Sequence, residues 1–507
     1  MRYLYLIPIL LTIILWSSCR KDFEFDPSSG NLEFSQDTVF LDTIFTNISS
    51  RTYSFTVRNT SKDAIEIPTI RLGNGQDSRY RLNVDGEAGK EFQNIPILAQ
   101  DSIFIFIETT VPASAISEVE FLYTDAILFD SGSNQQQVQL VTLVKDAVFL
   151  FSNTLSDNTA ASMVTGLDAN GNEISVEGFT LNDDQLNFTN EKPYVIYGYA
   201  AVADEKQLTI DAGARVHFHE NSGIIVQEGA SLQINGSLST DQELLENEVI
   251  FEGDRLEPEF SNTPGQWGSI WLSAGSINNT INYLTLKNAT VGILVEGDGL
   301  LSAPTLTIKN TQIFNSLNTN ILATSAYINA ENLVLGSAGS NSLHCNLGGT
   351  YTFIHSTIAN YWVNGFRTNA ALRLDNSDND LNANFNNCII DGNNSIELDL
   401  NNTDTNTFDF SFTNCMIKFE DTRGFFIDNP LYDFTNLDFY NEVLINQETD
   451  FKDTRNNNFN IGELSEAGNN ANIASALIVP LDILGFDRTN TPAIGAYQIC
   501  ITEDTVE

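Results

Sequence analysis

Five basic side chains in the central part of the chain could contact an anionic polymer. They are Lys287, Lys309, Arg367, Arg373 and Lys418. A lysine or arginine can remove a proton next to a carboxylate, provided that a cation neutralises that carboxylate. Lys287 and Lys309 would give a two-point contact for an anionic chain, or they belong to an ordinary solvated face. The second interpretation is favoured because both residues sit in regular repeats.

One short segment combines aromatic rings with cations. Tyr361, Trp362, Phe366 and Arg367 lie in the run YWVNGFR, and Arg373 follows closely. Aromatic rings beside a positive charge can form a platform for sugar rings. The alternative, packing of this segment on its own neighbourhood, is favoured. We nevertheless expect any function to be found here first.

Other candidate sites are weaker. His217 and His219 stand beside Glu220 and could hold a metal, but no third ligand is apparent among only four histidines. The chain has no phosphate loop, nucleotide fingerprint, nucleophile elbow or haem motif. We therefore assign no catalytic residue, no metal site and no cofactor, with Ca²⁺ left open.

Six stretches of the chain repeat a strand, a polar pivot and a second short strand. The pivots are separated by 22, 22, 23, 32 and 27 residues, which is the period of a stacked coil. We expect them to form a ladder in which each side chain hydrogen-bonds to the next coil. The pivots are Asn288, Asn310, Asn332, His355, Asn387 and Asn414.

Charge and length bound the possibilities. The formal net charge of −42 excludes nucleic acid as a partner, because no basic cluster offsets repulsion from phosphates. This acidity most simply keeps a β-rich protein soluble, and the alternative is divalent-cation or cationic-ligand binding. At 507 residues the chain should form two or three domains.

The pattern along the chain predicts an all-β protein with two main parts. Short alternating strands indicate an antiparallel sandwich over residues 35–148, after a polar tether over 19–34. Asn59-Thr60 and Asp101-Ser102 resemble landmarks of immunoglobulin-like domains of the abnormal-spindle and Hydin type. Such domains act mostly as spacers or docking platforms. Residues 149–192 would be a connector.

The following region resembles right-handed parallel β-helix proteins of the pectate-lyase-like superfamily. The resemblance rests on Asp211-Ala212-Gly213, Gly229-Ala230 and the step from Trp267 to Ile270. It implies a β-helix over residues 193–424 and last coils with a cap over 425–507, closed by the Ile494–Tyr497 motif. Alternation predicts eight core residues, namely Leu208, Ile210, Val216, Phe218, Ile224, Val226, Leu232 and Ile234.

This resemblance also raises enzymes that cut acidic polysaccharides. Polygalacturonase-type enzymes use aspartates in several characteristic short motifs. Asn402-Thr403-Asp404 and Asp183-Asp184 each match one such motif, but only as isolated short sequences. A Gly-His-Gly motif is absent from the sequence. These sequence matches are too short to support a catalytic assignment.

The N-terminus resembles the signal of a bacterial lipoprotein. Arg2 precedes an apolar run up to Trp16 that is too short to span a bilayer stably. Ser17-Ser18-Cys19 resembles the lipoprotein cleavage site, which implies removal of residues 1–18 and lipidation of Cys19. A plain secretory signal is the alternative. Acidic residues soon after Cys19 resemble surface-export signals of Bacteroidetes lipoproteins, which implies the outer membrane and the cell surface.

Two cysteines occupy equivalent places in successive repeats. Cys388 and Cys415 each follow a pivot by one residue. Neighbouring coils about 4.8 Å apart would allow a disulfide, whereas buried thiols acting as apolar fillers are the favoured alternative.

These observations together predict a lipid-anchored cell-surface protein with a non-catalytic scaffold, adhesion or glycan-binding role. Its partners would be the membrane, through the anchor, and polysaccharides or cell-surface proteins. The alternative is a polysaccharide lyase or glycosidase that acts on acidic glycans, which this fold class permits.

Overall fold

The computed structural model describes residues 25–113, 120–151, 162–167, 173–299 and 302–499. The protein is nearly all β. It divides into two compact units, Met1–Asp146 and Ala147–Glu507. The described residues contain one short α-helix, α2 (Ile473–Ile478). None of the described helices is long and apolar enough to span a membrane.

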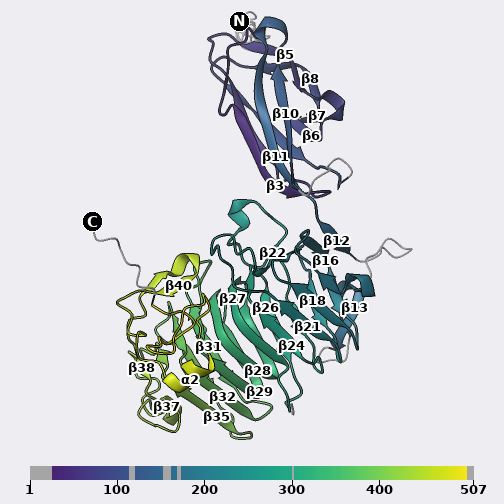
Figure 1. The fold of residues 1–507 in the computed structure, drawn as a ribbon. Coiled ribbons are helices and arrows are strands. Elements are labelled where there is room, and N and C mark those ends of the chain that lie inside the picture. The colour runs from purple at the N-terminus through teal and green to yellow at the C-terminus, as the bar shows by residue number, and fades with distance from the viewer. Residues whose placement is uncertain (1–24, 114–119, 152–161, 168–172, 300–301, 500–507) are drawn as a thin grey trace, which may run out of the picture. The chain divides into compact units, whose positions relative to one another are not determined.

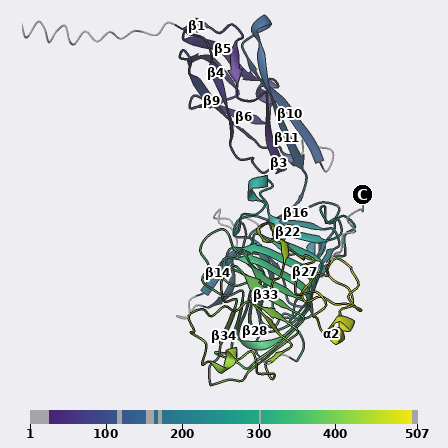
Figure 2. The ribbon, with the colours of Figure 1, turned by 90° about the vertical axis from the view of Figure 1, so that its left-hand side faces the viewer.

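The N-terminal unit consists of two sheets that share one core (Figure 2). The first sheet contains β1 (Asp26–Pro27), β5 (Ile65–Leu72), β8 (Glu91–Ile97), β10 (Glu120–Phe129), β11 (Gln136–Lys145) and β3 (Thr38–Phe45). The second contains β2 (Leu32–Phe34), β4 (Tyr53–Asn59), β9 (Ser102–Thr109), β6 (Tyr80–Val84) and β7 (Glu87–Gly89).

Alternation of side chains builds the core of this unit. On β9, Ile105 and Ile107 are fully buried while Phe104 and Phe106 point outward and are exposed. The predicted Asn59-Thr60 turn depends on a buried amide: Asn59 Nδ2 donates to the carbonyls of Asp63 at 2.8 Å and Leu98 at 3.0 Å. That side chain therefore holds two loops together.

In the C-terminal unit, parallel strands stack in three rows (Figure 1). Most strands pair in parallel with the strand three places later in the chain. β27 (Leu306–Ser316), β28 (Thr319–Ala338) and β29 (Leu343–Ile354) are long enough to run through corners and contribute to more than one row. Each circuit of the chain therefore adds one strand to each row.

The remaining strands fall into these rows. The first row contains β12 (Val148–Phe151), β16 (Tyr194–Tyr197), β19 (Arg215–Phe218), β22 (Val249–Gly253), β25 (Leu284–Lys287), β30 (Thr357–Asn360), β33 (Ile389–Gly392), β36 (Met416–Ile417) and β38 (Leu444–Ile445). The second contains β14 (Glu173–Thr180), β17 (Tyr199–Val202), β20 (Gly223–Val226), β23 (Ile270–Leu272), β26 (Val291–Glu296), β31 (Leu372–Asp375) and β34 (Leu398–Asn401). The third contains β15 (Asn187–Phe188), β18 (Gln207–Asp211), β21 (Ser231–Asn235), β24 (Asn279–Asn282), β32 (Leu381–Asn386), β35 (Phe408–Thr413) and β37 (Tyr440–Asn441).

The stack begins earlier than the sequence pattern indicated. β12, β14 and β15 lie within the expected connector, yet they pair in parallel with β16, β17 and β18. β13 (Ser162–Leu167) pairs with β14 in an antiparallel hairpin. The connector therefore supplies the first strands of all three rows.

One continuous apolar core runs through the stack. The eight predicted core residues are all fully buried, so that prediction is confirmed. Near the C-terminal end, Phe353, Phe385, Phe412 and Tyr440 form a column of parallel rings with centroids 5.1, 4.9 and 5.7 Å apart. Stacked rings at this spacing add aromatic contact to the burial of their area.

Five of the six pivots lie in one corner of the stack. Asn310, Asn332, His355, Asn387 and Asn414 follow successive third-row strands and have positive φ between 48° and 55°. Asparagine tolerates this left-handed conformation better than most residues, which explains why it recurs at the bend. We call these five residues the corner row.

The structure places Asn288 in a different corner. The pairing of Lys287 with Phe314 makes Asn288 the neighbour of Asn315, whereas Asn282 pairs with Lys309. Tyr283, also at positive φ, therefore occupies the place that precedes Asn310. The sequence pattern assigns Asn288 to the wrong corner because both bends require the same backbone conformation.

The last part of the chain, residues 446–499, is here called the strap. It contains β39 (Phe451–Asp453), β40 (Asn458–Ile461) and α2. Outward apolar residues of the first row, including Phe314, Val334 and Ile389, share a separate core with strap residues such as Phe459 and Ile494. The Ile494–Tyr497 motif thus packs along the side of the stack instead of closing its end.

Candidate functional site

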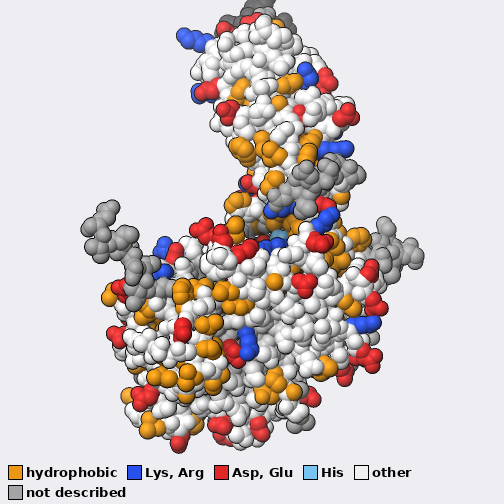
Figure 3. Space-filling model, in the orientation of Figure 1, with side chains coloured by type: hydrophobic (Ala, Val, Ile, Leu, Met, Phe, Trp, Pro, Cys, Tyr) orange, Lys and Arg blue, Asp and Glu red, His pale blue; other side chains and the backbone are white. Residues whose placement is uncertain are grey.

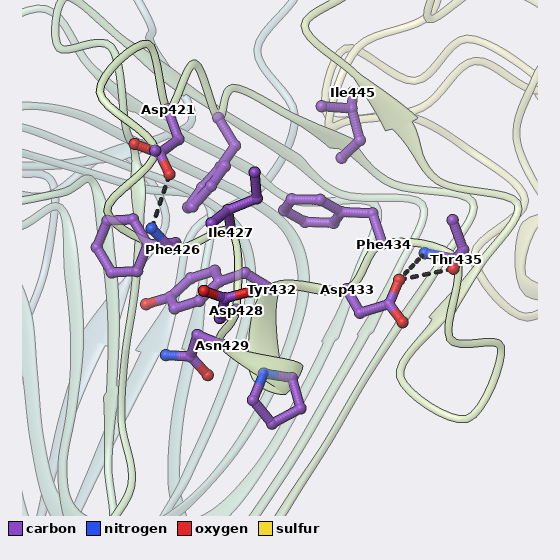
Figure 4. Close-up of a pocket in the computed structure, with 13 residues that line it drawn as sticks. Asp421, Phe426, Ile427, Asp428, Asn429, Tyr432, Asp433, Phe434, Thr435 and Ile445 are labelled. Carbon is purple, nitrogen blue, oxygen red and sulfur yellow. Dashed lines mark hydrogen bonds between the residues drawn. The ribbon is translucent and has the colours of Figure 1, made fainter.

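A cavity of about 570 Å³ opens where the strand pattern loosens, before the strap begins (Figure 4). Residues from a single stretch of chain line it. They are Phe419, Asp421, Gly424, Phe426, Ile427, Asp428, Asn429, Pro430, Tyr432, Asp433, Phe434, Thr435 and Ile445. We call this cavity the end pocket.

Short turns built on acidic and amide side chains shape its walls. The Asp421 carboxylate accepts hydrogen bonds from the backbone N–H groups of Phe425 at 3.0 Å and Phe426 at 2.7 Å. Asn429 accepts from Leu431 N–H at 3.0 Å and begins the turn Pro430–Tyr432. Asp433 accepts from the backbone and hydroxyl of Thr435, as Figure 4 shows. Asp and Asn favour such local turns.

Aromatic rings form the floor of the end pocket. The Tyr432 ring lies 4.9 Å from Phe419 and 4.6 Å from Phe426, and Phe434 lies 5.2 Å from Phe419. Tyr432 Oη accepts a hydrogen bond from Leu400 N–H at 2.8 Å, which satisfies a donor of β34. Burial raises the pKa of Tyr432 to about 12, so its hydroxyl is neutral. The rings therefore both cover the end of the stack and line the cavity.

The charged groups of the end pocket are all acidic. Asp421, Asp428 and Asp433 line it, and its lining includes no Lys, Arg or His. Hydrogen bonds from their own turns lower the pKa values of Asp421 and Asp433. Both are therefore ionised acceptors at neutral pH. Ile427 is 83% exposed, and the exposed Asp428 has no hydrogen-bond partner among the described residues.

The structure does not assemble the aromatic platform around Tyr361, which was the less favoured interpretation of this segment. Arg367 is buried, and its guanidinium contacts the Glu397 carboxylate at 2.6 and 2.9 Å and the Asn360 carbonyl at 2.8 Å. Trp362 is buried as well, whereas Phe366 is 92% exposed. Because Arg367 faces inward, it is not available as the cation of a surface platform.

The other two residues of that set have polar partners. Tyr361 Oη donates to Asp391 at 2.9 Å and lines a smaller hollow of about 190 Å³ with Lys418. Arg373 lies 3.6 Å from both Asp375 and Asp399. Burial raises the pKa of Asp399, while hydrogen bonds from Ser377 and Asn401 outweigh burial and lower the pKa of Asp375. Two carboxylates with opposite shifts thus flank one cation.

The remaining candidates are also paired. Lys287 and Lys309 contact Glu252 at 2.7 Å and Glu331 at 2.8 Å. His219 Nδ1 contacts Asp254 at 2.7 Å, a hydrogen bond that raises the pKa of the imidazole. The described residues contain no group of three or more His, Cys, Asp or Glu that could hold a metal.

The corner row forms hydrogen bonds both along the stack and with the strap. Asn332 Nδ2 donates to Asn310 Oδ1, and Asn387 Nδ2 contacts His355 Nε2, both at 2.9 Å. Backbone carbonyls of the strap accept hydrogen bonds from three side-chain amides of this row. The Leu481 carbonyl accepts from Asn332, that of Asn472 accepts from Asn387, and that of Asn470 accepts from Asn414. The buried Arg488 donates to Asn332 Oδ1 at 3.1 Å. This row therefore fastens the strap.

The cysteines of the stack are free and buried, and Cys388 and Cys415 lie in neighbouring repeats without a disulfide. Asn402 and Thr403 hydrogen-bond to Asn376 in a loop. Cys19 lies outside the described residues, so its lipidation stays a prediction.

Sequence reasoning missed the end pocket. The available signal was the run FEDTRGFFIDNPLYDF, in which aromatic residues alternate with Asp and Asn turn formers. The sequence pattern of that run predicts only the beginning of a cap. Clustered aromatic residues outside a regular strand pattern would have been the correct indication.

Comparisons with known proteins give no close relative. No family model and no curated protein matches the chain. A family 123 glycoside hydrolase from Clostridium perfringens matches over 22% of this chain and 26% of its own length, at 9% identity and TM-score 0.17. The chain therefore spans about a quarter of that hydrolase.

Two smaller structures also match. A PapD-like domain of human CEP192 is 7% identical over 24% of this chain and 89% of its own, at TM-score 0.16. The periplasmic chaperone SfaE is 12% identical over 32% of this chain and 71% of its own, also at TM-score 0.16. Likenesses this distant carry no argument about function. The function is therefore argued from the site itself.

Proposed function

We propose that this chain is a bacterial cell-surface protein that binds neutral saccharides in the end pocket without cleaving them. In this proposal the C-terminal unit is a right-handed parallel β-helix, the N-terminal unit is an immunoglobulin-like spacer, and a lipid on Cys19 anchors both to the outer membrane. Parallel pairing of strands three places apart supports the β-helix. The lipoprotein-like N-terminal sequence supports the anchor.

The observation that carries the proposal is the composition of the end pocket. A pyranose ring has an apolar C–H face and hydroxyl groups around its edge. Its face can stack on the rings of Phe426 and Phe434, while its hydroxyls donate to carboxylates such as Asp428. A volume of about 570 Å³ accommodates one or two sugar rings.

Charge decides which saccharides fit. Three carboxylates without a cation in the lining repel a uronate or a sulfated sugar. The face shown in Figure 3 likewise carries scattered acidic side chains and few basic ones. The proposed ligands are therefore neutral glycans, which differs from the acidic substrates that the sequence resemblance implied.

Two of the three carboxylates of the end pocket support binding over hydrolysis. A glycosidase needs one protonated acid and one ionised partner. Asp421 and Asp433 both have lowered pKa values and accept hydrogen bonds from their own turns, so neither is a proton donor near neutral pH.

A test uses the purified chain in native gels that contain starch, galactomannan or polygalacturonate. A neutral polysaccharide should retard the protein, and polygalacturonate should not. Asp428→Asn keeps the shape of the side chain and should weaken retardation severalfold, because the amide accepts hydroxyl hydrogen bonds less strongly than a carboxylate. Retardation by polygalacturonate alone would contradict the proposal.

One observation favours a second candidate, cleavage of a glycan at Arg373. Asp399 and Asp375 flank this cation and their pKa values shift in opposite directions, which is the pattern of an acid and base pair. If this cluster is catalytic, polysaccharide incubation should release reducing ends, and Asp399→Asn should abolish that release. We rank it second because Asp375 is buried and already accepts from Ser377 and Asn401.

The anchor is tested by fractionation of cells. Cys19→Ser should move the protein from the membrane to the soluble fraction, because the lipid attachment point is removed. Unchanged membrane association of this variant would contradict the anchor.

A further inference from the structure

The N-terminal unit exposes a pair of aromatic rings on the outer face of its second sheet. Phe104 and Phe106 stand two residues apart on β9 and are 56% and 42% exposed. Their ring centroids are 6.3 Å apart and their planes differ by 23°. Figure 2 shows β9 between β4 and β6, so both neighbouring strands border the rings. The two ring planes are therefore nearly parallel, and both rings offer exposed apolar surface on this face.

A cavity of about 400 Å³ lies beside these rings. Phe106 forms one wall, and Arg81, Asn83, Glu108 and Thr52 supply polar atoms to the lining. Asn83 is the cross-strand neighbour of Phe106 on β6. Its Oδ1 accepts from Gly86 N–H at 3.1 Å, an arrangement that fixes the amide beside the ring. The rings are therefore next to hydrogen-bonding groups held in place.

The charges on this face balance one another. Arg81 lies 3.6 Å from Glu108, and Arg58 lies 3.7 Å from Glu33 on the same sheet. Arg81 also donates to Thr110 Oγ1 at 3.1 Å. Because each cation faces a carboxylate, the surface has no excess charge to recruit an anionic or a cationic ligand.

We propose that this face of the N-terminal unit is a second saccharide-binding site, specific for an extended neutral glycan. Two successive sugar rings would stack on Phe104 and Phe106, and hydroxyls of the ring above Phe106 would bond to Asn83, Arg81 and Glu108. Balanced charge, a ring pair and a polar-lined hollow together match this ligand class. The N-terminal unit is then a binding module and not only a spacer.

This site shares its ligand class with the proposed function but stands on different residues and a different unit. Two weak sites on one chain raise the overall affinity for a long polymer, because binding at one site increases the effective ligand concentration at the other. Short oligosaccharides cannot benefit from this effect. The proposal therefore predicts tighter binding to polymers than to their short fragments.

The experiment measures retardation of the full chain in native gels that contain starch, hydroxyethyl cellulose or galactomannan. Five proteins are compared, namely wild type, Phe104→Ala/Phe106→Ala, Phe426→Ala, the triple variant and a control. Phe40→Ala is the matched control, since Phe40 is 65% exposed on β3 of the other sheet. Both exposed rings can be removed without opening the core, so unfolding midpoints should change little.

We expect the double variant to bind a retarding polymer about tenfold more weakly, and the triple variant to lose binding. Phe40→Ala should behave as wild type. Retardation of the double variant equal to that of wild type overturns the inference, as does a wild type that no neutral polymer retards. If Phe426→Ala has no effect while the double variant fails to bind, this inference holds and the end pocket is excluded.

A second variant tests ring stacking as the mode of binding. Phe106→Trp enlarges the stacking surface and should keep or strengthen polysaccharide retardation. Loss of retardation in this variant, with an unchanged unfolding midpoint, would contradict stacking as the mode of binding.

Discussion

Two segments that interrupt the strand repeat differ in their accessibility to ligands. The segment around Tyr361 and Arg373 is held against the next coil by Arg367 and Glu397, whose side chains are only 1% and 0% exposed. The segment over residues 419–445 remains open and encloses the end pocket. Both are rich in aromatic residues, and both leave the regular strand pattern.

The difference lies in how each segment satisfies its charges. Arg367 pairs with a buried carboxylate, and this pair draws the chain inward at the cost of desolvating both ions. The lining of the end pocket contains no cation, and backbone N–H groups of local turns stabilise the ionised Asp421 and Asp433 carboxylates at the surface. A break in the repeat period therefore indicates only that a segment leaves the regular strand pattern. The charged residues of that segment decide whether it packs inward or encloses an accessible pocket.

The largest expected effect comes from breaking the closed segment. Glu397→Gln leaves the Arg367 guanidinium buried beside a neutral amide, which should lower the free energy of unfolding by roughly 3–5 kcal/mol. Denaturant titration measures this loss. Glu331→Gln is the matched control, because its pair with Lys309 is partly exposed and should cost less than about 1 kcal/mol. Equal losses in both variants would show that the Arg367 pair does not hold the segment closed.

A smaller effect is expected where the strap meets the corner row. Asn332→Leu removes hydrogen bonds to Asn310 and Leu481 and leaves Arg488 with one acceptor fewer, at about 3 kcal/mol. The strap should also become more sensitive to limited proteolysis. Asn329→Leu, on the outer face three residues earlier, should change little. A strap that stays protected in Asn332→Leu would contradict the fastening role.

Acid sensitivity should follow from His355. Burial, with the nearby Arg488, lowers the pKa of this imidazole well below its ordinary 6.5. As pH falls below about 6.5, the unfolded chain takes up a proton that the folded chain refuses, so stability decreases, by up to about 2 kcal/mol at pH 5. Thermal unfolding of His355→Asn should show a shallower decline between pH 6.5 and 5. Parallel pH profiles for the two proteins would contradict this account.

The fold was more predictable than the site. Alternating apolar residues correctly placed all eight predicted core positions, because inward side chains of a strand must leave water. The recurring Asn correctly indicated a bend, since few residues accept positive φ. Asn288 was misplaced because a second bend has the same requirement. Tyr283, which occupies the expected place, carries no such signal in its residue type.

Pairing across long sequence distances explains what the sequence leaves open at the site. The sequence does not decide between a surface cation and a packed side chain for Arg367, because its partner Glu397 lies thirty residues later and no local pattern links them. The strap likewise looked like an end cap, since contacts such as Arg488 to Asn332 join distant positions. The end pocket, in contrast, is built from one local run of residues. Its Asp and Asn turns were visible in the sequence, but their enclosure of a hollow was not.

The central claim is that the end pocket binds neutral saccharides. Isothermal titration calorimetry of variants at two adjacent phenylalanines tests this claim most directly. Phe426 lines the end pocket, whereas Phe425 is 72% exposed and lies outside it. With an oligosaccharide of the polymer that retards the wild type, Phe426→Ala should bind at least tenfold more weakly and Phe425→Ala should bind as wild type. Equal affinities for Phe426→Ala and Phe425→Ala would contradict the claim.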